Sequence, residues 1–148
     1  MKPRLKLFVI LSAVALLIRC KKDDSNNLVG IRDHSFLDVL IWCGYDTDKD
    51  GNISLAEARA VKSLNINGCN ISDLSGIESF GNLEMLNCGS NTFAELNLTG
   101  NHALKILVIE GGNLTKLDVS GATSLTVLDC DGNLLTTLDV SKILFLIH

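Results

Sequence analysis

Residues 128–141 read LDCDGNLLTTLDVS, and two earlier stretches of the chain have the same arrangement. Residues 107–120 read LVIEGGNLTKLDVS, and residues 86–99 read LNCGSNTFAELNLT. The leading leucines Leu86, Leu107 and Leu128 are 21 residues apart, and a looser copy begins at Leu64, 22 residues before Leu86. Such a period indicates a repeat protein, in which each unit buries its apolar side only by stacking on the next.

Several columns of the aligned repeats stay apolar throughout. We therefore predict one short strand at each leading leucine, with parallel neighbours about 4.8 Å apart and inward side chains forming one core. The later runs LNL, LDV and LDV should form the opposite wall, and Asn91 and Asn133 should turn the chain and bond backbone groups of a neighbouring coil. The inward columns are Ile66, Cys88, Ile109 and Cys130, then Ile71, Phe93, Leu114 and Leu135, then Leu74, Leu96, Leu117 and Leu138.

The units follow the leucine-rich repeat pattern L-x-x-L-x-L-x-x-N/C-x-L most closely in LTVLDCDGNLL. The chain thus resembles a leucine-rich repeat protein over roughly residues 61–148, above all the short-repeat type of bacterial envelope lipoproteins. We assign residues 64–148 to about four such repeats. The last unit ends at His148 without a recognisable closing cap. That pattern fits either part of a longer array or a dimer formed through the last coil.

The stretch DTDKDGNISLAE, from Asp46 to Glu57, matches the signature D-x-[DN]-x-[DN]-G-x5-E without a gap. It resembles an EF-hand loop, which implies Ca²⁺ as a cofactor. Gly51 would occupy the sharp turn, which favours a positive φ. The alternative is an acidic surface turn that binds nothing. The implied ligands are the carboxylates of Asp46, Asp48 and Asp50, the carbonyl of Asn52, Ser54 directly or through water, and both oxygens of Glu57.

The flanks of this loop both read as helices. SFLDVLIWCGY places Phe36, Val39, Leu40 and Cys43 on one face, and Ser35 followed by Asp38 resembles a capping box. Ser54 and Glu57 have the same spacing and open a second helix to about Ser63. We therefore expect an α+β fold in which an EF-hand-like helix–loop–helix, residues 33–63, caps a short solenoid with a parallel sheet. Calcium would then be structural.

The first residues of the chain predict a targeting signal. A basic start and an apolar run from Leu7 to Ile18 fit a secretory signal over residues 1–19 and are too short to span a bilayer. LIRC followed by KKDDSNN resembles the lipobox and tether of Bacteroidetes surface lipoproteins, which implies lipidation of Cys20 and a polar tether over residues 20–32. The expected location is the cell envelope, lipid-anchored to the outer membrane and surface-exposed. An ordinary secretory signal with an incidental cysteine is the alternative.

Charge and cysteine spacing exclude several classes of function. Without the four bases of residues 1–19 the net charge falls from −4 to −8, which argues against nucleic acid as a partner. Cys88 and Cys130 lie two rungs apart, about 9.6 Å, which is too far for a disulfide. Pairing of Cys43 with Cys69 stays open. A nucleophile elbow, a phosphate loop and a supported Ser/His/Asp set are all missing from the sequence, so we do not expect an enzyme.

Outward strand positions are the candidate contact surface. Met85, Ile106 and Val127 should form an exposed apolar stripe beside an acidic edge, although ordinary solvated strand positions would read the same way. We expect a calcium-binding protein-interaction or adhesion module. The alternative is a glycan-binding accessory domain of a polysaccharide-handling system. The candidate surface residues are Met85, Asn87, Ile106, Val108, Val127 and Asp129.

Overall fold

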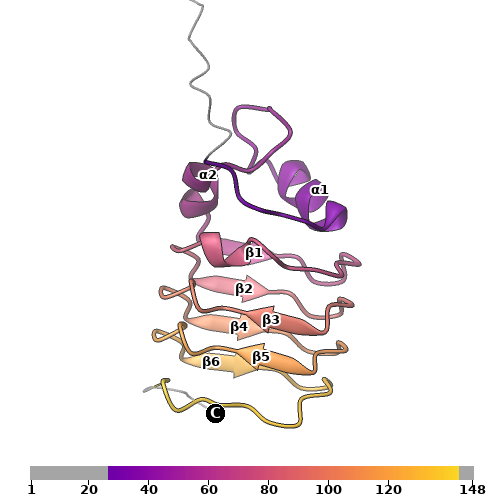
Figure 1. Ribbon diagram of the computed structural model, residues 1–148, viewed down its shortest axis with the longest axis vertical. Helices are drawn as coiled ribbons and strands as arrows, with labels where there is room; N and C mark the ends of the chain where they lie inside the picture. Colours follow the sequence, from indigo (N-terminus) through magenta and orange to yellow (C-terminus); the bar gives the residue numbers. More distant parts are fainter. Residues whose placement is uncertain (1–26, 144–148) are drawn as a thin grey trace, which may run out of the picture.

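A computed structural model of the chain describes residues 27–143 (Figure 1). The predicted signal sequence, Cys20 and the tether as far as residue 26 lie outside the described residues. The described part contains no helix long and apolar enough to cross a membrane. Two helices stand at one end of a stack of coils, and the strands of successive coils lie one beneath another.

The described residues form two parallel sheets, which make opposite walls of the stack (Figure 1). The first wall has the strand order β1 (Ser63–Asn65), β2 (Met85–Asn87), β4 (Ile106–Val108) and β6 (Val127–Asp129). The second wall pairs β3 (Glu95–Asn97) with β5 (Lys116–Asp118). The predicted strands at Leu64, Leu86, Leu107 and Leu128 are confirmed, because each leucine is the register partner of the next.

The inward columns form one continuous core. Leu86, Cys88, Leu107 and Ile109 are all buried, as predicted, and the columns through Ile71 and Leu74 are buried in the first three coils. In the fourth coil the corresponding residues are only partly buried, because this coil has a described neighbour on one side alone. These partly buried residues are Leu128, Cys130, Leu135, Leu138 and Val140.

Asparagine side chains, buried at Asn91 and half-buried at Asn133, connect consecutive coils, as the sequence predicts. The Nδ2 of Asn91 donates to the Ile66 carbonyl at 2.8 Å and the Cys88 carbonyl at 2.9 Å. Its Oδ1 accepts from the Ile71 amide at 3.0 Å. Asn133 repeats this arrangement one level lower, bonding the Ile109 carbonyl and the Leu114 amide. Each asparagine thus satisfies backbone groups of the preceding coil that water cannot reach.

The burial of a further asparagine, Asn101, was not predicted. Asn101 occupies a turn position that is apolar in the other coils, where Phe80, Ala122 and Ile143 lie. Its Nδ2 donates to the carbonyls of Ile77 and Phe80, at 2.9 and 3.1 Å, while its Oδ1 has no partner. These carbonyls belong to or directly follow the 3₁₀ helix η2 (Ile77–Ser79), which only the first coil has among the described residues.

The two helices form where the sequence places them, with different ends. Helix α1 spans His34–Trp42 and is capped by Asp33, whose carboxylate accepts from the Phe36 amide, so the predicted cap at Ser35 is wrong. The helix ends before Cys43, which is exposed rather than on the buried face. Helix α2 spans Leu55–Ala60 and is shorter than predicted. The capping box between Ser54 and Glu57 is confirmed.

The helical segment packs directly on the first coil. Phe36 of α1 and Phe80 of that coil are buried, with ring centroids 6.2 Å apart. Asp33 also reaches the coil, because its Oδ2 accepts from the Ser72 hydroxyl at 2.6 Å and the Ser72 amide at 2.8 Å. Partial burial alone would raise the pKa of Asp33, but the hydrogen bonds outweigh it and lower the pKa to about 2.

Replacing Asn91 with alanine should destabilise the fold by about 3 kcal/mol, because the buried Ile71 amide and Ile66 carbonyl lose their partner. Urea denaturation measures the change. Asn113→Ala, at an exposed position in the corresponding turn of the next coil, is the control and should cost less than about 0.5 kcal/mol. Equal losses for the two variants would contradict the role given to Asn91.

Candidate functional site

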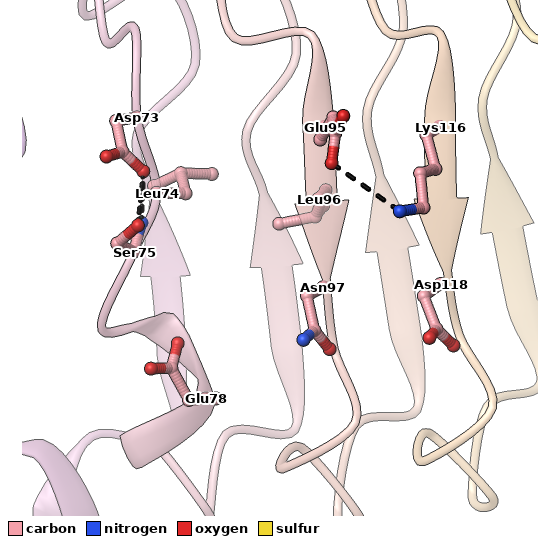
Figure 2. Close-up of a pocket in the computed structure, with 9 residues that line it drawn as sticks. All are labelled: Asp73, Leu74, Ser75, Glu78, Glu95, Leu96, Asn97, Lys116 and Asp118. Carbon is pink, nitrogen blue, oxygen red and sulfur yellow. Dashed lines mark hydrogen bonds and ion pairs between the residues drawn. The ribbon is translucent and has the colours of Figure 1, made fainter.

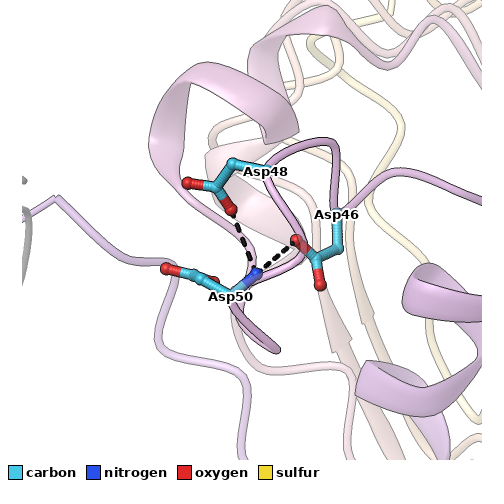
Figure 3. Close-up of side chains that lie close together, drawn as sticks. All are labelled: Asp46, Asp48 and Asp50. Carbon is cyan, nitrogen blue, oxygen red and sulfur yellow. Dashed lines mark hydrogen bonds between the residues drawn. The ribbon is translucent and has the colours of Figure 1, made fainter. Parts of the chain in front are cut away.

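The loop between α1 and α2 brings together three of the predicted calcium ligands (Figure 3). Asp46, Asp48 and Asp50 each present a carboxylate oxygen, and these oxygens lie within 4.8 Å of one another. Asp46 is buried, with 8% of its surface exposed, whereas Asp48 and Asp50 are exposed. The cluster opens to solvent on the side of the two exposed carboxylates.

Backbone amides of the loop itself position these carboxylates. The Gly51 amide donates to the Oδ2 of Asp46 at 3.0 Å, and the Asp50 amide donates to Asp46 and Asp48, at 3.2 Å in each case. Gly51 has a φ of +83°, so the sharp turn predicted there is confirmed. The loop therefore has an internal framework that draws three negative charges together.

Glu57 lies outside this carboxylate cluster. Its Oε1 accepts from the Thr47 amide and hydroxyl, both at 2.7 Å, and its Oε2 accepts from the Ser54 amide and hydroxyl, both at 2.9 Å. Partial burial alone would raise the pKa of Glu57, but these four hydrogen bonds outweigh it and lower the pKa to about 2. Both oxygens of Glu57 therefore close the loop by joining its start to the first turn of α2.

Asn52 and Ser54 likewise make hydrogen bonds within the loop. The Asn52 amide donates to the Oδ1 of Asp50 at 2.8 Å, and the Ser54 hydroxyl donates to Glu57. Oxygen donors in a compact loop are the chemistry that calcium requires, and the aspartate half of the loop fits it. Ligation through Glu57 would exchange its hydrogen bonds to Thr47 and Ser54 for bonds to the ion.

A short extended segment pairs with the backbone of the loop. Residues 27–31 belong to the predicted tether, yet Val29 is buried and Leu28 forms an antiparallel bridge with Ser54. The Val29 amide donates to the Ile53 carbonyl at 2.8 Å, and the Leu55 amide donates to the Asn27 carbonyl at 2.7 Å. Ile53 is fully buried behind this bridge. The segment thus pairs with the backbone of the loop around Ile53 and Ser54.

The candidate binding surface lies on the four-stranded wall. Met85, Ile106 and Val127 are direct register partners across β2, β4 and β6, which places them in one row. Met85 is 43% exposed and Val127 38% exposed, with Ile106 between them half-buried. Asn87, Val108 and Asp129 form the parallel row two positions along, and all three are half-buried. We call the first row the apolar stripe.

The described cysteines are all free thiols. Cys88 is fully buried, and burial raises its pKa well above the ordinary value, so its thiol stays protonated and acts as a small apolar side chain. Cys43 and Cys69, whose pairing the sequence leaves open, are unpaired.

The structure singles out two residues that the sequence reasoning missed. Trp42, at the end of α1, is 86% exposed and lies beside Asp38 and Cys69 on a surface hollow of about 470 Å³. The only sequence signal is an aromatic residue at the end of a helix pattern. Asp33 was missed as the cap because Ser35 offered a competing cap, and the contact that favours Asp33 lies 39 residues away, at Ser72.

Comparison with solved structures identifies the fold. The functional domain of InlJ from Listeria monocytogenes, described as including a cysteine ladder, is 40% identical with 62% of this chain covered and a TM-score of 0.59. An internalin, InlF, from the same species is 22% identical with 74% covered and a TM-score of 0.61. The CBM51-2 and INT domains of ZmpB from Clostridium perfringens are 26% identical with 60% covered and a TM-score of 0.50.

The chain folds as a bacterial leucine-rich-repeat-like solenoid. It spans 20%, 32% and 18% of the length of these three chains, so the likeness concerns only a part of each of these proteins. No protein-family model matches the chain, and no curated protein matches it.

Replacing Glu57 with glutamine should make the free energy of unfolding less dependent on pH at acid pH, in the absence of metal. The folded-state pKa of Glu57 is about 2, below its ordinary value of 4.5, so its ionised form stabilises the fold above pH 4.5. That contribution is lost as the pH falls through the folded value. Urea unfolding in chelator between about pH 5 and pH 2 should show a steeper decline for the wild type than for Glu57→Gln. Glu110→Gln, at an exposed acid, should decline like the wild type.

Proposed function

We propose that this chain is a protein-interaction or adhesion module of the bacterial cell envelope, with the four-stranded wall as its contact surface. The observation that carries the proposal is the register of the apolar stripe, because three apolar side chains on neighbouring strands are aligned toward solvent. An apolar patch with a polar rim is typical of protein interfaces. The likeness to the InlJ domain supports the solenoid fold on which this surface is built.

The rim of the stripe differs in charge at its two sides. At the strand starts, Glu84 is neutralised by Lys105 at 2.6 Å and Lys62 at 3.9 Å. At the strand ends, Glu110 and Asp131 are exposed and belong to no ion pair among the described residues. A partner with an apolar centre and basic groups beside the strand ends fits this distribution.

Calcium is the second element of the proposal. Asp46, Asp48 and Asp50 would supply carboxylates, with Asn52, Ser54 and Glu57 completing the set by the roles that the loop pattern implies. The bound ion would neutralise the clustered negative charge of the loop. Because the loop joins α1 to α2 and both pack against the coils, the free energy of binding would stabilise the capped solenoid. The ion would therefore have a structural role.

Lipid anchoring through Cys20 is the third part of the proposal. A lipid on that cysteine, after removal of residues 1–19, would attach the protein to the outer membrane and leave residues 27–143 facing outward. Stable attachment requires more than one acyl chain, which multiply acylated cysteines provide. The proposal includes no enzymatic activity, in keeping with the sequence.

One observation favours glycan binding as a second candidate. The Trp42 ring is 86% exposed, and Asp38 beside it offers hydrogen-bond acceptors. A flat aromatic surface with a polar neighbour suits the apolar face and hydroxyl edge of a sugar ring. A glycan array compared with Trp42→Ala separates this candidate from protein binding through the apolar stripe, because the two surfaces share no residue.

Charge placed on the apolar stripe should abolish binding to a protein partner. Met85→Asp with Val127→Asp disrupts the centre of the proposed interface at exposed positions that the fold does not need. Bacterial and host surface proteins captured by the immobilised wild-type chain should be lost, a change of at least about tenfold in affinity. Thr99→Asp with Thr123→Asp, exposed and of equal charge, is the control. Capture unaffected by the stripe substitutions would exclude this surface.

Calcium should raise the thermal stability of the protein. An affinity of about 10⁻⁴ M, in the range of extracellular modules, gives about 2.7 kcal/mol at a hundredfold excess of ion. Asp46→Ala should remove the shift, and calorimetric titration should show one site per chain. Asp38→Asn, which removes an acid from the exposed side of α1, should keep it. Identical melting in calcium and in chelator would contradict the proposal.

A further inference from the structure

Helix α1 places a carboxylate and an indole ring together on its outer face. Phe36 and Leu40 are buried on the inner face of the helix. Asp38 and Trp42 each follow one of these residues by two positions, which is about 200° around a helix, and both are exposed. Because Asp38 and Trp42 are four residues apart, they are neighbours on that face, with Cβ atoms about 5–6 Å apart.

The hollow beside Trp42 has few groups that could bind a ligand. Its volume is about 470 Å³, and it is lined by Ser35, Asp38, Val39 and Trp42 of α1 and by Cys69 of the first coil. The Trp42 side chain is 86% exposed. Asp38 carries the charge of this lining, and no lysine, arginine or histidine lines the hollow among the residues that the structure describes. One aromatic ring and one negative charge therefore determine what the hollow can bind.

Charge alone does not distinguish this hollow from other acidic surfaces of the molecule. The groove of about 310 Å³ between the first coil and strand β3 is also acidic (Figure 2). There, Glu95 is paired with Lys116 at 3.6 Å, and Asp73 accepts from the Ser75 amide at 2.7 Å. Asp38 belongs to no ion pair among the described residues, and its neighbour in the hollow is an aromatic ring instead of a lysine. Its charge is therefore available to a ligand.

We propose that this hollow binds sugar residues that carry a free ammonium group, such as glucosamine. This inference rests on glycan binding, the second candidate function, and adds the class of sugar. The apolar face of the sugar ring stacks on Trp42, and the ammonium group pairs with the Asp38 carboxylate. The ammonium group is also attracted to the face of the indole ring. Neutral sugars leave Asp38 without a charged partner, and Asp38 repels sugars that carry a carboxylate or sulfate.

The make-up of the hollow favours a sugar over a lysine side chain. Alkylammonium groups of proteins are typically recognised by a cage of several aromatic rings. The described lining of this hollow contains a single ring, that of Trp42. One exposed ring is sufficient to stack against one face of a sugar.

Trp42 is the only tryptophan of the chain, so its fluorescence reports directly on the hollow. A glucosamine trimer and an N-acetylglucosamine trimer, titrated at about pH 6, differ in having a protonated amine or an uncharged acetamide. The wild-type protein should bind the glucosamine trimer about fivefold more tightly, which is the most that one exposed ion pair provides. Asp38→Asn should bind both trimers with the weaker affinity of the N-acetylglucosamine trimer.

Asp139→Asn is the matched control, because it removes the same charge from an exposed position of the fourth coil and keeps an oxygen that can accept from the Ser141 amide. This variant should keep the fivefold preference. Trp42→Ala, followed through the NMR signals of the ligands, should lose binding of both trimers.

Equal affinity of the wild type for the two trimers, or an equal loss of preference in Asp139→Asn, would overturn the selectivity for ammonium and leave glycan binding standing. Absence of binding by either trimer at about 10 mM would overturn both. Lysine with its α-amino and α-carboxyl groups blocked should bind more weakly than the glucosamine trimer. Equal binding of this blocked lysine would show that the ammonium group alone is recognised and would overturn the stacking of a sugar on Trp42.

Discussion

Lateral pairing of parallel strands at a fixed repeat length is the constraint on which this structure depends. A strand of three residues has too few bonds and too little apolar surface to be stable alone. Placing Leu64, Leu86, Leu107 and Leu128 side by side joins these weak elements into one core. The same register aligns Met85, Ile106 and Val127 on the outside. The candidate contact surface is thus a direct consequence of the period that builds the interior.

Carboxylates connect the helical segment to itself and to the solenoid. Asp33 both caps α1 and binds Ser72 of the first coil, and Glu57 binds Thr47 and Ser54 at the two ends of the acidic loop. Each makes several hydrogen bonds in the folded protein, which is why both have pKa values near 2. At the helical end these polar contacts therefore add to the apolar packing of Phe36 on Phe80.

Features that recur or that depend on near neighbours could be predicted from the sequence. The strands, both walls and the Asn91 and Asn133 bonds follow from periodic columns, and the Ser54–Glu57 box follows from a spacing of three residues. The aspartate cluster follows from loop spacing, although the place of Glu57 outside it does not, because hydrogen bonds from Thr47 compete for its oxygens.

Features that depend on distant contacts could not be predicted. Packing of Val29 behind Ile53 joins a polar-looking segment to a loop more than twenty residues later. The first coil is one residue longer than the next two and forms no strand beside β3, and the groove of about 310 Å³ between them does not follow from the leucine columns. Cys43 shares the helical spacing of Phe36 and Leu40, but the helix ends one residue too early to bury it.

The coils are nearly identical, so the leucine columns alone do not determine which coil packs against which. Asn101 resolves this ambiguity at one level. Its buried amide donates to the carbonyls of Ile77 and Phe80 in the preceding coil, and in that coil the same turn position is held by Phe80, which packs on Phe36 of α1. A chain threaded one level out of step would place the Asn101 amide beside the Phe36 ring without those two carbonyls, at a cost of about 1–3 kcal/mol. One polar residue in an apolar column thus distinguishes the correct order of coils from its close competitors.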